Sequence, residues 1–118
     1  MDIGIHEIAA RYGVRITHEW PAKKTVLGEA PHPQYVQLLD TPDGRVIFVA
    51  NSEWLECGEL ALHELAHAIL GFDMTGNDAY RQEMECYALE RQWALELTNP
   101  EVCAQVLQEI DRLELELA

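Results

Sequence analysis

The chain has 118 residues, 48% of them hydrophobic, which suits one domain over residues 1–118 with a modest core. A net charge of −13 with only eight Lys and Arg argues against direct nucleic acid binding, which needs clustered basic residues. No apolar run is long enough to cross a bilayer, and residues 1–7 lack the basic start and apolar stretch of a signal peptide. We therefore expect a cytoplasmic protein that does not bind membranes; composition specifies no oligomeric state.

The first part of the chain is predicted to contain a short helix and an edge of a sheet. Apolar residues from Ile5 to Tyr12 recur at helical spacing, and Gly13 is a plausible stop. Residues 14–20 then alternate between apolar and polar, which is typical of a strand. Residues 21–34 hold three prolines and a glycine and read as a loop, with a short extended piece at 25–27.

A β-hairpin is the clearest feature of the middle of the chain. Residues 35–39 and 45–50 are its predicted strands, and residues 40–44 carry Pro and Gly at turn positions. Residues 46–49 are apolar on both faces, which predicts a central strand covered on both sides. With the strand at 14–20, this gives a small antiparallel sheet of about three strands.

Three helices are predicted to follow the hairpin. The first begins at a cap on Asn51 or Ser52, runs to about Leu70 and stops at Gly71. Because it is apolar nearly all round, we expect it to be the buried centre of the fold. Further helices are predicted at about 79–97 and 100–115. The predicted fold class is therefore α+β, with the sheet packed on a central helix and the other helices flanking it.

The central helix contains the sequence His63-Glu64-Leu65-Ala66-His67, an H-E-x-x-H motif. Histidines at positions i and i+4 lie on one helix face, so their imidazoles can converge on one Zn²⁺ ion. Glu64, next to the first histidine, is then placed to take a proton from a water molecule at the metal. Two histidines and a glutamate are expensive to bury in an apolar helix without such a role.

A catalytic zinc site needs a third protein ligand and one open position. If the next helix starts near residue 78 and runs back antiparallel, Glu85 lies about 10 Å along it, level with the gap between the two histidines. Glu83, at about 7–8 Å, is nearly level as well. The helix faces do not separate the two, so both stay open as the third ligand on geometry alone.

Three segments together resemble the ImmA/IrrE-type zinc metallopeptidase family. They are the strand Val46–Asn51, the helix segment His63–Leu70, and Glu83-Met84-Glu85-Cys86-Tyr87. The family's pattern is a hydrophobic strand ending in Ile-Asn, an H-E-L-x-H helix and a later E-x-E-A-x-x-F-A helix. Here Cys86, Leu89 and Glu90 depart from the last segment. The resemblance covers roughly residues 35–97.

The resemblance implies a zincin-like fold with zinc held by His63, His67 and Glu85 and with Glu64 as general base. It also implies a cytosolic protein or peptide substrate, such as a DNA-binding repressor of a phage or mobile element. The function expected from the sequence is therefore zinc-dependent peptide hydrolysis. The alternative is a metal-stabilised protein-binding module without turnover, which should tolerate Glu64→Gln.

Overall fold

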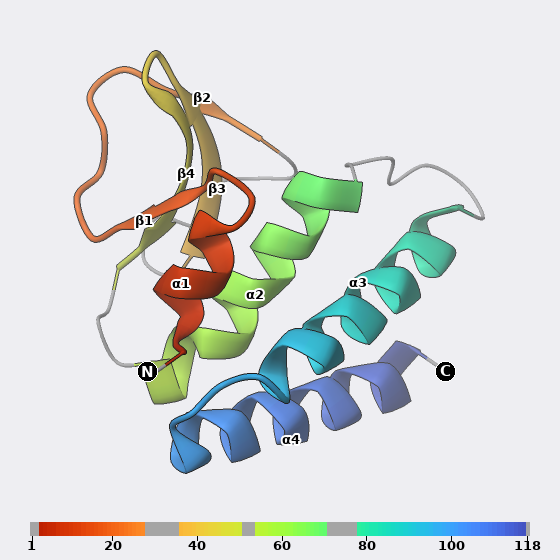
Figure 1. Ribbon diagram of the computed structural model, residues 1–118. Coiled ribbons are helices and arrows are strands. Elements are labelled where there is room, and N and C mark those ends of the chain that lie inside the picture. The colour runs from red at the N-terminus through yellow and green to blue at the C-terminus, as the bar shows by residue number, and fades with distance from the viewer. Residues whose placement is uncertain (1–2, 28–35, 51–53, 71–77, 118) are drawn as a thin grey trace.

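A computed structural model describes residues 3–27, 36–50, 54–70 and 78–117. Within these ranges four helices and four strands form an α+β fold, as the sequence predicts (Figure 1). None of the helices in these ranges is long and apolar enough to cross a membrane. In chain order the elements are α1 (Ile5–Ala10), β1 (Arg15–Thr17), β2 (Thr25–Val26), β3 (Val36–Thr41), β4 (Gly44–Val49), α2 (Trp54–Leu70), α3 (Asp78–Ala94) and α4 (Pro100–Leu117).

The sheet has the strand order β1-β4-β3-β2, so the prediction of about three antiparallel strands is wrong in two respects. The short piece Thr25–Val26 pairs with β3 and adds a fourth strand. The strand β1 pairs parallel to β4, with Ile16 opposite Ile47, which makes the sheet mixed. A parallel neighbour requires a crossover, and here the chain passes through β2 and β3 before it returns to β4 beside β1.

The hairpin is confirmed, with β3 and β4 paired antiparallel from Val36↔Val49 to Thr41↔Gly44. Gly44 has φ +120°, a conformation that side chains rarely adopt, and the Thr41 hydroxyl donates to the Gly44 carbonyl at 2.7 Å. As predicted, β4 is central and buried on both faces. Ile47 and Val49 face the main core, whereas Val46 and Phe48 face a smaller cluster with Leu39.

The helix α2 lies between the sheet and the pair α3–α4 (Figure 1), so the prediction of a central helix is confirmed. Leu62 and Leu65 are fully buried in the main core. Gly58 permits close helix approach, because a Cβ there would lie 3.3 Å from Ile5 of α1 and 3.4 Å from Val106 of α4. At the other end, Arg45 of β4 donates to the Ala68 carbonyl at 2.9 Å. These contacts set the position of the motif helix.

The helices α3 and α4 meet at a capped turn. The Asn99 side chain accepts hydrogen bonds from the Glu101 and Val102 amides, and Pro100 is the first helical residue, as predicted. The helix α3 ends at Ala94, three residues before the predicted end. The predicted cap at Asn51 or Ser52 and the predicted stop at Gly71 lie outside the described residues.

Candidate metal centre

His63 and His67 lie one turn apart on α2 and turn their rings toward the same point. Their Nε2 atoms are 3.2 Å apart, and their ring planes are nearly perpendicular, at 83°. Both side chains are largely buried, with exposed fractions of 13% and 7%. Two neutral imidazoles cannot bring nitrogen lone pairs this close without a proton or a cation between them. The helix therefore presents two nitrogen donors to one point, as its i, i+4 spacing predicts.

The neighbouring helix α3 supplies a carboxylate to that point through Glu83. Its Oε1 lies 2.8 Å from His67 Nε2, and its Oε2 lies 3.1 Å from His63 Nε2. The Glu83 side chain is 16% exposed. These three residues form a group whose donor atoms could hold one metal ion.

Glu85, the third ligand that the resemblance implies, does not join this group. Its side chain is 53% exposed, and its nearest described charged partner is Arg81, at 3.4 Å on the same helix. Two residues along a helix correspond to a rotation of about 200°, so Glu83 and Glu85 point to nearly opposite sides although their axial levels are similar. The expectation that Glu85 faces the histidines is corrected: the structure places Glu83 there.

A signal for Glu83 exists in the sequence of α3. Glu83, Cys86, Tyr87 and Glu90 follow the spacing i, i+3, i+4, i+7, which is one helix face. In the structure this face packs on α2, with Cys86, Tyr87 and Glu90 buried. The Tyr87 ring lies 5.1 Å from the His63 ring, and the Cys86 Sγ lies 3.8 Å from His67 Nδ1. Glu83 belongs to that face, whereas Glu85 does not.

Two further carboxyl groups, neither of them singled out as site residues from the sequence, lie behind His63. Glu90 on α3 is fully buried, and its Oε2 lies 2.8 Å from His63 Nδ1. Glu59 on α2, one turn before His63, is 6% exposed and lies near both. Burial raises the pKa of Glu59 to about 9 and that of Glu90 to about 8, while a hydrogen bond with Glu59 acts against the shift of Glu90.

Glu64, the candidate general base, lies next to the cluster in a partly buried position on α2. Burial raises the pKa of its carboxyl, and the positive charges that His63 and His67 can carry act against that shift. The net direction is upward, toward the range in which a carboxylate accepts and returns protons near neutral pH. The structure thus gives Glu64 both a position beside the histidines and a basicity above that of an ordinary glutamate.

The cluster has more carboxyl groups than histidines. Burial acts to raise the pKa of Glu83, but hydrogen bonds from His63 and His67 outweigh it and lower this pKa to about 2. For His63, burial favours the neutral form, but the hydrogen bond and charge of Glu83 outweigh it and raise the pKa. Within the described ranges, no Lys or Arg pairs with Glu59, Glu64, Glu83 or Glu90. Two histidines thus face four carboxyl groups, a composition that favours a cation.

The stability of the metal-free chain should depend on pH through Glu59. Below pH 4.5 the Glu59 carboxyl is protonated in both folded and unfolded states, whereas between pH 4.5 and about 9 it keeps its proton only in the folded state. The free energy of unfolding should therefore fall as the pH rises through this window. The raised pKa of His63 acts in the same direction.

Urea unfolding in the presence of a chelator, at pH 6 and pH 8.5, measures this effect. The wild-type chain should be less stable at pH 8.5, and Glu59→Gln, which resembles the neutral carboxyl in shape, should lose less stability between the two pH values. An equal loss in both proteins would show that Glu59 does not cause the dependence.

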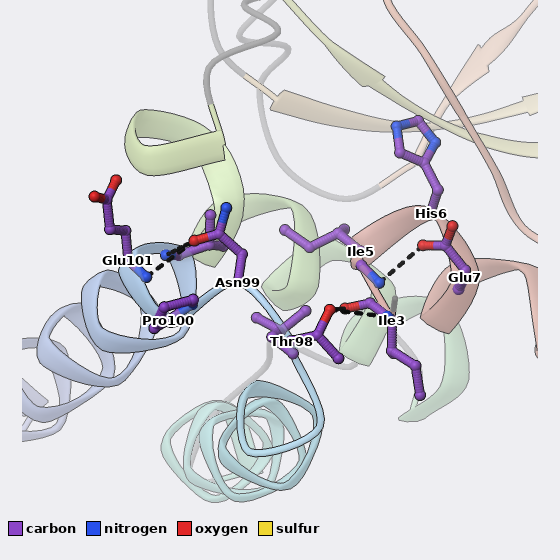
Figure 2. A pocket seen from close by; sticks show the side chains of 11 residues that line it. Ile3, Ile5, His6, Glu7, Thr98, Asn99, Pro100 and Glu101 are labelled. Carbon is purple, nitrogen blue, oxygen red and sulfur yellow. Dashed lines mark hydrogen bonds between the residues drawn. The ribbon is translucent and has the colours of Figure 1, made fainter. Parts of the chain in front are cut away.

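A separate hollow of about 630 Å³ lies where α1 meets the junction of α3 and α4 (Figure 2). It is lined by residues 3–7 and 97–102, none of which belongs to the histidine cluster. The Thr98 hydroxyl accepts a hydrogen bond from the Ile3 amide at 3.0 Å and donates one to its carbonyl at 3.1 Å, which ties the two segments together. These hydrogen bonds hold the N-terminal segment against the helices. The hollow itself has no part in the candidate metal centre.

In comparisons with protein-family models, with curated proteins and with solved structures, no match to this chain was found.

Proposed function

We propose that the chain is a zinc-dependent peptidase whose metal is held by His63, His67 and Glu83. The observation that carries the proposal is the close spacing of the donor atoms of these three residues at a junction of two helices: the two Nε2 atoms are 3.2 Å apart, and the two Glu83 oxygens lie 2.8 and 3.1 Å from them. Zinc–ligand bonds of 2.0–2.1 Å in a tetrahedron place neighbouring ligand atoms about 3.3 Å apart. Two imidazoles and one carboxylate are also a ligand set typical of catalytic zinc.

The charge of the surroundings supports a divalent cation at this point. Carboxylates buried without a compensating positive charge destabilise a fold by several kcal/mol each. Here Glu59 and Glu90 are buried, Glu64 is partly buried and Glu83 is mostly shielded, all beside the same pair of histidines. Without a cation, burial keeps Glu59 and Glu90 protonated at neutral pH, and a cation bound to Glu83 and the histidines would stabilise the ionised forms of the carboxyl groups around it.

Bound zinc would supply Lewis-acid chemistry, making a water molecule more acidic and polarising the carbonyl of the scissile peptide bond. The chain's own contribution is Glu64. Its carboxylate accepts the proton of the attacking water and returns it to the leaving amine, a role for which its raised pKa suits it. His63 and His67 hold their positions through the rigid turn of α2 between them.

The resemblance to the ImmA/IrrE-type family supports the peptidase class and extends the proposal to a zincin-like fold. It also names a substrate class, a DNA-binding repressor protein of a phage or mobile element. The third ligand differs from the family's pattern, because that pattern would use Glu85 and the spatial arrangement favours Glu83. The net charge of −13 is consistent with a protein partner that carries basic surface.

A second candidate is a metal-stabilised module that binds a protein without cleaving it. Burial favours this alternative, because the three ligand side chains are only 7–16% exposed and a substrate carbonyl needs access to the metal. In such a module the cluster would tie α2 to α3 and so stabilise the binding surface. The two functions differ in their requirement for Glu64.

A zinc titration of the purified chain tests the metal centre. We expect one zinc per chain and a higher Tm in zinc than in chelator, because a ligand that binds the folded state stabilises it by about 2.7 kcal/mol at 100 times its Kd. His67→Ala should lose both effects. His6→Ala, which changes an exposed histidine of α1, is the matched control. If the wild-type chain binds no zinc, or if His67→Ala keeps its zinc and Tm shift, the metal centre is refuted.

A further inference from the structure

The fully buried carboxyl of Glu90 makes a single directed contact with the candidate metal centre. Its Oε2 lies 2.8 Å from His63 Nδ1, and within the described residues its Oε1 has no hydrogen-bond partner. The other nitrogen of the same ring, Nε2, faces Glu83 and His67 at 3.1 and 3.2 Å. His63 is therefore held between a buried carboxyl on one side and the proposed metal position on the other.

This arrangement selects one of the two neutral forms of the imidazole. In its ionised form Glu90 only accepts hydrogen bonds, so the His63 nitrogen beside it carries the proton. With the proton on Nδ1, the lone pair lies on Nε2 and points at Glu83 and His67. A histidine that binds a metal through one nitrogen commonly donates its other N–H to such a carboxylate, which sets the ring orientation and raises its basicity.

We propose that Glu90 is a positioning residue, which holds His63 in the Nδ1–H form with Nε2 directed to the metal. As far as it concerns the metal, this inference rests on the proposed function. Glu90 follows Glu83 by seven residues, two turns along the same face of α3. One helix face thus supplies both the third ligand and the group that orients the first.

The role is not shared by the other buried carboxyl. Glu59 lies near His63, and no hydrogen bond joins the two residues. Glu59, His63 and Glu90 could as a group hold a metal ion. That would require His63 to bind the metal through Nδ1, the nitrogen that in our assignment donates a hydrogen bond to Glu90. The two arrangements place the His63 proton on opposite nitrogens, so the proton position distinguishes them.

The test combines two measurements on the intact chain. Nitrogen NMR shifts of the His63 ring, recorded at alkaline pH where the ring is neutral, report which nitrogen carries the proton with and without zinc. Competition with a chelator reports zinc affinity. The variants are Glu90→Leu, which removes the acceptor at similar size, Glu90→Gln, whose amide oxygen can still accept from Nδ1, and the matched control Glu59→Gln.

We expect the wild-type chain to show a protonated Nδ1 in both states. Glu90→Leu should lose this preference and bind zinc about 10- to 100-fold more weakly, the usual cost of removing a group that orients a ligand. Glu90→Gln should keep the Nδ1–H form and lose less affinity, and Glu59→Gln, which removes no hydrogen bond to His63, should keep the Nδ1–H form and also lose less affinity than Glu90→Leu. If Glu90→Gln keeps the Nδ1–H form while Glu90→Leu loses it, the effect comes from the hydrogen bond that orients His63 and not from changing a buried side chain in general.

Three outcomes overturn the inference. One is zinc affinity in Glu90→Leu equal to wild type, and another is an equal loss in Glu59→Gln. The third is loss of the Nδ1 proton when zinc is added, which would place the metal in the Glu59, His63 and Glu90 group. Should Glu90→Leu fail to fold, the wild-type ring shifts still decide, because a His63 that carries its proton on Nε2 in the zinc-free chain overturns the inference. If wild type binds no zinc but shows the Nδ1–H form, the proposed function fails and the orientation of His63 by Glu90 stands.

Discussion

Glu64→Gln is expected to abolish peptide hydrolysis while leaving the zinc content and the Tm unchanged. The substitution keeps the size of the side chain and removes its ability to accept a proton. General base catalysis contributes about 10²- to 10⁴-fold to a rate, and we expect a loss in that range or greater. Because His63, His67 and Glu83 supply the donor atoms, the metal should stay. The assay is cleavage of co-expressed repressor candidates, followed by mass spectrometry of the fragments.

A matched control for this experiment is Glu101→Gln, an exposed glutamate in the first turn of α4, which should cleave as wild type does. Equal cleavage by wild type and Glu64→Gln would show that Glu64 is not the base. If neither cleaves any partner, yet both bind the same partner and complement the same cellular phenotype, the protein-binding module is the correct function.

Glu83→Ala should weaken zinc binding more than about 100-fold, beyond the range usual for groups that act through a ligand. The reason is direct: its two oxygens lie 2.8 and 3.1 Å from the histidine nitrogens. Glu85→Ala is the natural control, two residues away on the same helix but 53% exposed and paired with Arg81, and should bind zinc as wild type does. A competition titration with a chelator measures both affinities.

The opposite result would identify Glu85 as the third ligand. If Glu85→Ala loses the metal and Glu83→Ala keeps it, the third ligand follows the ImmA/IrrE-type pattern, and α3 must turn by about 200° about its axis when zinc binds. Equal losses in both variants would indicate that neither carboxylate is the dominant ligand. Either result would refute Glu83 as the third ligand while leaving the pair His63 and His67 in place.

Much of the fold could be predicted because its signals are local. The turn residues Pro42 and Gly44 define the hairpin, and the apolar run at residues 46–49 marks a strand covered on both faces. The parallel pairing of β1 with β4 could not be predicted in this way. Strand periodicity shows which side chains share a face but not which neighbour a strand chooses, and that choice depends on how the chain crosses over in space.

In the candidate site, too, one part could be predicted from the sequence and the other could not. His63, Glu64 and His67 lie within one turn of a single helix, so backbone geometry alone brings the two imidazoles together, and the sequence by itself determines that pair. The third donor comes from α3, where Glu83 and Glu85 have nearly the same axial level. Only the rotation of α3 against α2, set by burial of Cys86, Tyr87 and Glu90, turns Glu83 inward and Glu85 to solvent. The contact of Glu90 with His63 has the same origin, because it joins residues on two helices, and helix packing rather than helix periodicity decides which of them meet.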